Sequence, residues 1–340
     1  MSDVEALPVS ATETIERDVV LRLRDLRVSF PTEDGDVQAV RGIDLDVRQG
    51  ELLGIVGESG SGKSVTFLAV MGLLPKSAKI TGSATVRGQE LIGVSANEMR
   101  KVRGKKIAMI FQDPLSALNP THRVANQIAE MVRAHQEVSM ADALDRAVEL
   151  LDLVGIPQPE RRARQYPHEF SGGMRQRVMI AMAIANDPDV LIADEPTTAL
   201  DVTVQAQILD VIQRVQTELG AAVVFITHDL GVVARVADRV QVMYAGRSAE
   251  RGVVEDILLR PTHPYTRGLL ASLPTGGRAR LTPIPGAPPN MLHPPSGCAF
   301  RTRCTFAMPV CAEGLPDLRP FGTVETACVR AEELLATEDR

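Results

Sequence analysis

The chain has 340 residues, of which 44% are hydrophobic and 24% are charged, and its net charge at pH 7 is −6. That length and apolar content support a sizeable hydrophobic core, whereas the negative charge gives no support to a nucleic-acid-binding function. The apolar runs are too short to span a bilayer and the polar N-terminus lacks a signal core, so we expect a cytosolic protein with residues 1–18 as a loose tail.

A glycine-rich loop lies between a predicted strand and a predicted helix. The apolar run 51–56 is typical of a buried strand, and residues 65–70 are compatible with a helix. Between them, residues 57–64 (Gly-Glu-Ser-Gly-Ser-Gly-Lys-Ser) match the phosphate-loop pattern G-x-x-x-x-G-K-[ST] in its expected context. Such a loop turns backbone N–H groups toward phosphate oxygens, while Lys63 neutralises the outer phosphates and Ser64 binds Mg²⁺. We predict that ATP is bound by Gly57, Ser59, Gly60, Ser61, Gly62, Lys63, Ser64 and Val65.

Three further apolar runs are typical of buried strands, and each is followed by polar side chains. The runs cover residues 107–111, 190–193 and 223–227. Because ligands gather beyond the carboxyl ends of parallel strands, we expect these polar side chains near the bound nucleotide. Asp194 suits the Mg²⁺ shell, and Glu195 can polarise the attacking water. Gln112 can reach Mg²⁺ or water, and we predict that His228 contacts the γ-phosphate or the water.

Between about 113 and 186 the pattern becomes helical, and a second glycine-rich turn lies near the end of that region. Ser171 is a good N-cap residue, and Gly172 and Gly173 allow a close backbone approach. The helix through residues 178–185 would direct its positive end toward phosphate. Because a single-chain NTPase has no use for this second turn, we infer that the active site is shared between two chains.

Taken together, these motifs resemble the nucleotide-binding subunit of an ABC transporter, and the resemblance covers most of the chain. It implies an α/β fold, in which the RecA-like core of an ABC-type P-loop NTPase, with a mixed sheet, carries a β-subdomain and a helical subdomain. The nucleotide-binding domain would cover residues 19–257, with its helical subdomain at about 113–186. The resemblance also implies ATP hydrolysis with Mg²⁺, with Glu195, His228 and Gln112 as catalytic residues.

Other residues take family roles by their position. Two such subunits pack head to tail in the family, so Ser171–Gly173 of one chain would cap the ATP held by the other. Asp201 belongs to the D-loop, and Phe30 lies where the family places an aromatic ring on adenine. Residues 113–120 lie where the family grips a coupling helix of the membrane subunit. Met174 stands where many members have Gln, and in this the chain is similar to peptide importers.

The four cysteines of the chain all lie near its C-terminus. They are Cys298, Cys304, Cys311 and Cys328. They follow a stretch with seven prolines between residues 274 and 297, which favours an extended path. Disulfides are disfavoured in a reducing cytosol, so the clustered thiols suggest a metal site. Their spacing fits neither the paired knuckles of structural zinc nor bacterial ferredoxins, and it leaves both Zn²⁺ and a [4Fe–4S] cluster open.

Residues 263–267 (His-Pro-Tyr-Thr-Arg) and 297–304 look like the C-terminal extension of oligopeptide and dipeptide importer ATPases, some of which carry a [4Fe–4S] cluster. The resemblance therefore favours that cluster, in an extension over residues 258–340. It implies uptake of di- or oligopeptides, with nickel or opines as alternatives, by a peripheral protein on the cytoplasmic face of the cell membrane. The implied partners are a second ABC ATPase subunit (a related chain in a heterodimer), two integral-membrane permeases and an extracytoplasmic solute-binding protein.

Two other classes of ABC protein fit the sequence less well. A soluble ABC ATPase that acts on nucleic acid would need a long coiled-coil or DNA-binding insertion, and the short helical region lacks one. A translation factor with tandem ABC domains would need two sets of motifs, whereas this chain has one. We therefore expect no nucleic acid among the partners.

Overall fold

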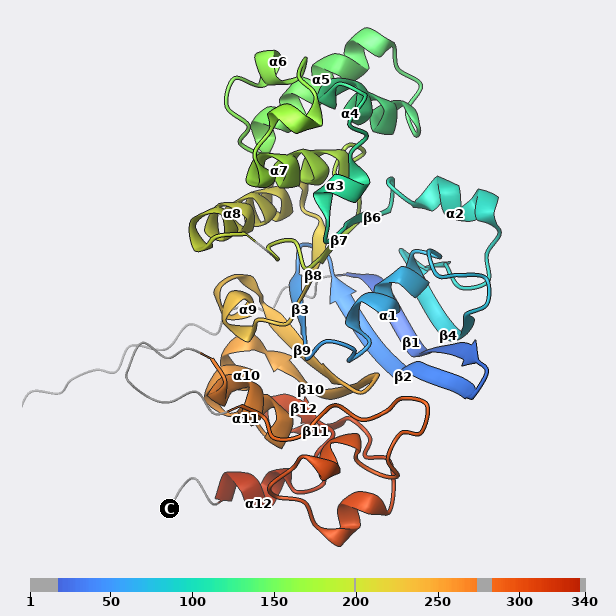
Figure 1. Cartoon of the computed structure of the whole chain (residues 1–340), viewed down its shortest axis with the longest axis vertical. Coiled ribbons are helices and arrows are strands. Elements are labelled where there is room, and N and C mark those ends of the chain that lie inside the picture. Colours follow the sequence, from blue (N-terminus) through green and yellow to red (C-terminus); the bar gives the residue numbers. More distant parts are fainter. Residues whose placement is uncertain (1–17, 199, 274–282, 337–340) are drawn as a thin grey trace, which may run out of the picture.

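The computed structural model describes residues 18–198, 200–273 and 283–336, which form two sheets with helices around them (Figure 1). The tail expected over residues 1–18 lies outside the described residues apart from Asp18, as does the 274–282 part of the proline-rich stretch. Among the described helices, none is both long enough and apolar enough to cross a membrane.

The smaller sheet is antiparallel, has four strands in the order β2-β1-β4-β5, and packs on the helix that follows the predicted phosphate loop. Its strands are β1 (Val19–Thr32), β2 (Gly35–Arg48), β4 (Lys79–Val86) and β5 (Gln89–Glu90). Apolar residues of β1 and β2 share one core cluster with Phe67 of that helix, α1 (Lys63–Val70). Buried and exposed positions alternate along much of β2, as expected when only one face of a sheet is covered.

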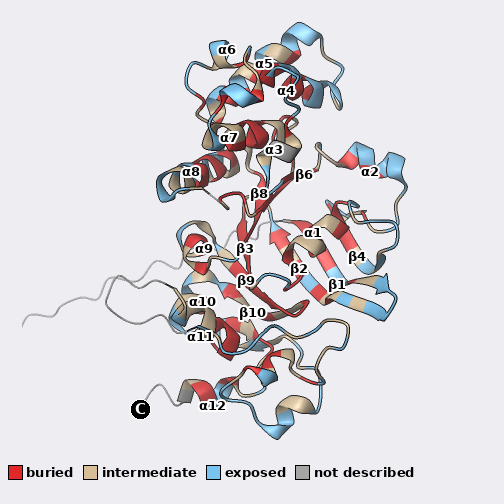
Figure 2. Ribbon diagram, in the orientation of Figure 1, coloured by how far each residue is buried: buried red, intermediate tan, exposed pale blue. Residues whose placement is uncertain are grey.

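The larger sheet has eight strands in the order β11-β12-β10-β9-β3-β8-β7-β6. Its strands are β3 (Leu52–Val56), β6 (Ile107–Ile110), β7 (Val190–Asp194), β8 (Ala222–Thr227), β9 (Arg239–Tyr244), β10 (Arg247–Val253), β11 (Arg319–Phe321) and β12 (Val324–Thr326). The pairs from β6 to β9 are parallel and those from β9 to β11 are antiparallel, so the sheet is mixed, as the resemblance implied. Every residue of β3, β7 and β8 is buried (Figure 2). Burial on both faces explains why these strands are continuous apolar runs in the sequence.

A helical lobe lies beyond the β6 edge of the larger sheet and occupies the top of Figure 1. It contains α3 (Pro114–Ala117), α4 (Val124–Arg133), α5 (Met140–Leu153), α6 (Pro159–Arg162), the short 3₁₀ helix Pro167–Glu169 and α7 (Gly172–Ala183). The remaining helices are α2 (Ala96–Val102), α8 (Val202–Leu219), α9 (Leu230–Val236), α10 (Val254–Leu259), α11 (Pro264–Ala271), α12 (Ala331–Ala336) and the 3₁₀ helices Ala299–Thr302 and Pro309–Ala312. Helix α2 lies between β5 and β6, where the sequence analysis names no helix. It forms because Ser95 and Glu98 make a reciprocal capping box at its start.

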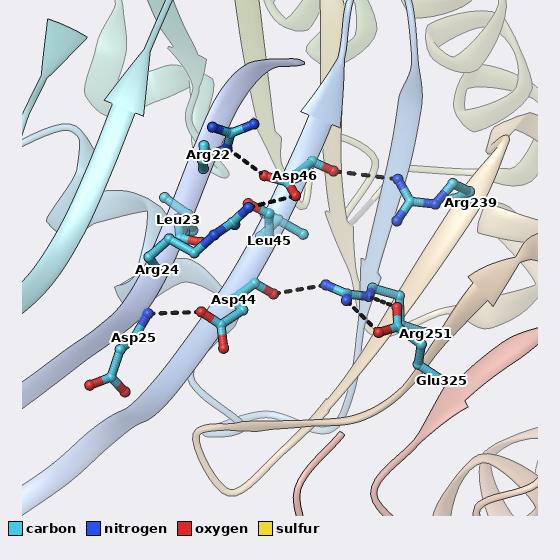
Figure 3. Close-up of polar contacts among 10 residues, drawn as sticks. All are labelled: Arg22, Leu23, Arg24, Asp25, Asp44, Leu45, Asp46, Arg239, Arg251 and Glu325. Carbon is cyan, nitrogen blue, oxygen red and sulfur yellow. Dashed lines mark hydrogen bonds and ion pairs between the residues drawn. The ribbon is translucent and has the colours of Figure 1, made fainter. Parts of the chain in front are cut away.

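The C-terminal residues continue the larger sheet, because β12 pairs with β10 through Arg251 and Glu325. The Arg251 guanidinium donates to both carboxylate oxygens of Glu325, at 2.6 and 2.8 Å, and to the backbone carbonyl of Asp44 in β2, at 3.1 Å (Figure 3). Arg239 of β9 donates to the carbonyl of Asp46 in the same strand of the smaller sheet, at 3.4 Å. The C-terminal strands are thus packed into one body with both sheets.

Candidate active site

The predicted phosphate loop joins β3 to α1. Gly57 and Gly62 have positive φ angles of 155° and 97°, and a Cβ on either would lie within 2.5 Å of a backbone carbonyl oxygen, so only glycine fits at these two positions. Lys63 Nζ donates to the carbonyl oxygens of Gly57, at 2.7 Å, and Glu58, at 3.1 Å. The buried Ser61 hydroxyl has no hydrogen-bond partner among the described residues. The loop therefore holds polar groups with spare hydrogen-bonding capacity, as a phosphate site requires.

Ser64 and Asp194, which were both predicted to hold Mg²⁺, lie in contact. Ser64 Oγ donates to Asp194 Oδ1 at 2.7 Å. Burial raises the pKa of Asp194, and the nearby charge of Glu195 raises it further, although the bond from Ser64 opposes the shift. Burial likewise lowers the pKa of Lys63. Because both charged forms are disfavoured, a cation beside Asp194 and an anion beside Lys63 would be stabilised electrostatically. These residues therefore fit Mg²⁺ and a phosphate group.

The other polar residues selected from the sequence gather around the carboxylate of Glu195. Gln112 lies two residues after the end of β6, and its Nε2 donates to Glu195 Oε2 at 3.2 Å. His228, which follows β8, places Nδ1 3.3 Å from Oε1. The parallel pairing of β6, β7 and β8 brings these positions to one edge of the sheet, beside the Ser64–Asp194 pair. The structure thus assembles side chains that lie more than a hundred positions apart in the chain.

Two features of Glu195 were missed by the sequence analysis. Thr198 Oγ1 donates to Glu195 Oε2 at 2.9 Å, so a threonine joins the group around the carboxylate. Glu195 itself has a φ of 47°, in the left-handed region that costs a non-glycine residue free energy. The only available signal was the position of Thr198, three residues after the acid and beyond Pro196, which stops the strand. Such strain persists where surrounding contacts impose it, and here those contacts surround the candidate base.

The second glycine-rich turn opens α7, in the helical lobe and apart from α1 (Figure 1). Ser171 is the N-cap, and its hydroxyl accepts from the Met174 N–H at 3.3 Å, as predicted. A Cβ on Gly172 would meet nothing within 4 Å, whereas one on Gly173 would lie 2.5 Å from Val204 of α8. Gly172 therefore faces open space, and Gly173 is required for helix packing.

The remaining predicted site residues make contacts within the chain that do not test their predicted roles. Asp201 caps α8, because its carboxylate accepts from the backbone N–H groups of Thr203 and Val204, both at 3.0 Å. Phe30 of β1 and Val65 of α1 are partly buried and pack against the core cluster of the smaller sheet. A contact of Phe30 with adenine, and one of Val65 with the nucleotide, stay predictions.

The four cysteines line a single pocket of the C-terminal region, together with Phe300 and other side chains. All four are free thiols of intermediate exposure. Burial raises the pKa of Cys328 to about 11, and it also raises the pKa values of Cys298 and Cys304. Within the described ranges, no three His, Cys, Asp or Glu side chains lie close enough together to hold a metal ion. The four cysteines thus border one pocket, as their grouping in the sequence suggested, but the described residues do not form a metal-binding group.

Comparison with protein families and solved structures agrees with this geometry. Residues 40–198 match the family model described as "ABC transporter", and residues 249–311 match "Oligopeptide/dipeptide transporter, C-terminal region". Among solved structures, the ATP-binding cassette MJ0796 in a dimeric post-hydrolysis state with ADP and Pi has a TM-score of 0.62 and 27% sequence identity. That match covers 69% of this chain and 98% of the other.

Curated relatives match over most of the chain. The oligopeptide transport ATP-binding protein OppD of Bacillus subtilis is 54% identical over 304 residues, which cover 88% of this chain and 85% of the relative. OppD of Escherichia coli is 49% identical over 340 residues, or 98% of this chain and all of the relative. The dipeptide transport ATP-binding protein DppD of B. subtilis is 54% identical, with coverage of 87% and 90%. This chain therefore belongs to the ABC transporter family, as an ABC-type ATPase of the branch that carries the oligopeptide/dipeptide transporter C-terminal region.

Proposed function

We propose that this chain hydrolyses ATP to drive the uptake of di- or oligopeptides through a membrane ABC importer. The observation that carries the proposal is the gathering of Gln112, Thr198 and His228 around the Glu195 carboxylate, beside the Ser64–Asp194 pair. Peptides are favoured over nickel or opines because the relatives are named for oligopeptide or dipeptide transport. The net negative charge gives no support to an ABC ATPase that acts on nucleic acid.

In the proposed mechanism, the chain positions ATP and a water molecule for in-line attack. Backbone N–H groups of the phosphate loop and the Lys63 ammonium hold the phosphates. Bound Mg²⁺ would offset the phosphate charge, held by Ser64, Asp194 and Gln112. Gln112 and Thr198 both donate to Glu195 Oε2 and orient the carboxylate. Glu195, held in this way, is the general base that takes the proton of the water. His228, beside the other oxygen, would contact the γ-phosphate or the water.

We further propose that the site is completed by a second ATPase subunit, a related chain packed head to tail. Ser171–Gly173 lie apart from the phosphate loop of their own chain, and Gly172 faces open space, which suits the capping of a partner's ATP. The dimeric state of the solved neighbour MJ0796 supports a second subunit. Two integral-membrane permeases, contacted through residues 113–120, and an extracytoplasmic solute-binding protein would complete a complex in which this chain lies on the cytoplasmic face of the membrane.

The experiment that tests the function is reconstitution of the complete complex in lipid vesicles. We expect solute-binding protein loaded with peptide to stimulate ATP hydrolysis and labelled peptide to accumulate inside the vesicles. Peptide-free binding protein serves as the control, because it reports hydrolysis that is not coupled to solute. Stimulation by nickel or an opine but not by peptides would overturn the substrate, and a complex without ATPase activity would overturn the proposal as a whole.

We propose that the four cysteines hold a [4Fe–4S] cluster, and that Zn²⁺ is the alternative. Four thiols around one pocket form the donor set of such a cluster. Burial raises the pKa values of Cys298, Cys304 and Cys328, so bound metal would be needed to hold these three residues as thiolates. A cluster of this kind supplies a redox-active group bound through thiolate ligands.

Replacing any one of these cysteines by Ser is expected to remove the bound metal, because the site has no spare thiol among the described residues. Iron, acid-labile sulfide and zinc would be measured together with visible absorption in protein purified without oxygen. Thr305→Ser, an exposed neighbour of Cys304, is the matched control. Zinc in place of iron in the unchanged protein would assign the alternative metal. Unaltered metal content in every cysteine variant would contradict a four-cysteine site.

A further inference from the structure

The C-terminal region holds one residue of the phosphate loop, Glu58. Arg303 donates to both carboxylate oxygens of Glu58, from Nη1 at 2.5 Å and from Nη2 at 2.9 Å. The Glu58 backbone N–H donates to the hydroxyl oxygen of Tyr265, in α11, at 2.7 Å. The Glu58 carbonyl accepts from Lys63 Nζ at 3.1 Å and from the Ser61 N–H at 3.2 Å. Glu58 thus connects two C-terminal side chains to the lysine that would bind phosphate.

Arg303 is itself fixed on every side. It is 7% exposed, its Nε donates to the Pro285 carbonyl at 2.9 Å, and its Nη1 donates to the Tyr244 hydroxyl at 3.3 Å. Its guanidinium also lies over the rings of Tyr244 and Phe300, at 5.8 and 5.9 Å from their centroids. A bidentate arginine–carboxylate pair held in this way is directional, so a displacement of Arg303 would displace Glu58 with it.

The segment that carries Arg303 also builds the four-cysteine pocket. Arg303 directly precedes Cys304, and the neighbouring Phe300 lines that pocket with Cys298 and Cys304. Phe300 also packs against Tyr244 and Tyr265, with ring centroids 5.2 and 5.4 Å apart. The two residues that contact Glu58 therefore adjoin the wall of the cysteine pocket, Arg303 through its peptide bond to Cys304 and Tyr265 through its ring contact with Phe300.

We propose that Arg303 is a positioning residue for the phosphate loop, through which the four-cysteine segment sets the affinity of this chain for ATP. The inference rests on ATP binding at residues 57–64, as in the proposed function. It does not depend on which metal the cysteines hold. Because coupling between two sites is reciprocal, bound ATP also changes the state of the cysteine segment.

The first test measures ATP affinity and turnover in the complete complex for Arg303→Met and Arg303→Lys. Met keeps the apolar packing but removes the ion pair, so we expect ATP affinity to fall about tenfold, within the usual range of coupling between sites, with kcat at saturating ATP little changed. Lys restores the charge without the forked geometry and recovers part of the affinity. Arg319→Met is the matched control, since Arg319 pairs with Glu332 on the surface of the same region.

A general loss of folding is separated from lost positioning by the double variant Glu58→Gln with Arg303→Met. Removing both members of this partly buried pair relieves the uncompensated charge that a single replacement leaves, so stability recovers. The double variant still lacks the contact that positions the phosphate loop, so we expect ATP affinity to stay low. Recovery of ATP affinity together with thermal stability would show that Arg303 acts on folding alone, and would overturn the proposal.

The second test uses the reciprocal effect. The rate at which the backbone amides of residues 298–304 exchange hydrogen with deuterated water is followed by mass spectrometry, with and without Mg²⁺ and ATP. We expect ATP to change this rate several-fold in the unchanged chain, within the coupling range given above, and to have no effect in Arg303→Met even at ATP concentrations that saturate it. If the chain without substitutions binds ATP but ATP does not alter this rate, the inference is overturned and the proposed function stands. A chain that binds no ATP overturns the proposed function instead.

Discussion

Replacing Glu195 by Gln is expected to lower ATP turnover by about 10²–10⁴-fold, the usual contribution of a general base, while ATP binding is retained. The amide keeps the size of the side chain and can still bond to Thr198, which donates to Oε2 at 2.9 Å. It cannot take the proton of the attacking water. The loop, Lys63 and the Ser64–Asp194 pair are untouched, so ATP should still bind and close the dimer.

The measurements are steady-state hydrolysis by the complex assembled with its partners, equilibrium ATP binding, and the fraction of closed dimers at saturating ATP. We expect closed dimers to accumulate, since they form but cannot be reset by hydrolysis. Glu218→Gln is a matched control, because Glu218 is an exposed glutamate at the far end of α8. Normal turnover by the Glu195→Gln complex would remove Glu195 from the role of base.

Replacing Gly172 by Val is expected to disable the ATP bound by the partner subunit and to spare the ATP bound by this chain. A Cβ at Gly172 would meet nothing within 4 Å in this chain, so we expect the fold to be retained. In the closed dimer the added methyl groups would lie where the partner's phosphates approach. A misplacement of about 1 Å near reacting groups can lower a rate by about 100-fold, and we expect a loss of that size at the partner's site.

Gly172 is a better probe than its neighbour, because a Cβ on Gly173 would strike Val204 and disturb the packing of α7 on α8. Ala141→Val is the matched control, since Ala141 is exposed in the first turn of α5, in the same helical lobe. Photo-cross-linking of labelled ATP to each chain, together with hydrolysis by the complex, shows which site is affected. Loss of ATP from this chain, with the partner's site intact, would contradict a shared active site.

The local elements were predictable because short-range interactions form them. The loop 57–64 was recognised from glycines that its own backbone angles require, and the start of α7 from the capping hydroxyl of Ser171. The strands β3, β7 and β8 were recognised because burial on both faces leaves a continuous apolar run. Helix α2 was missed because its capping box is a weak signal inside a region of strands.

Residues that act through the fold were harder to find. Thr198 contacts Glu195 only because the turn after β7 brings its hydroxyl to the carboxylate. The left-handed backbone of Glu195 could not be predicted, because glutamate has no preference for that conformation. The cysteines were grouped correctly from their position near one end of the chain. Their separation around a pocket depends on how the segment folds, and this is why their spacing in the sequence could not choose between metals.

By itself, the sequence determined the class of this protein and the chemistry of its nucleotide site, since phosphate binding depends on residue types within one short loop and at the ends of apolar strands. Only the tertiary structure decided which C-terminal side chains contact that site. Arg303 and Glu58 are separated by 245 positions, yet they form a bidentate ion pair. The physical reason is that such a contact arises from the pairing of β12 with β10 and the packing of aromatic rings around Arg303, which no local pattern of residues encodes.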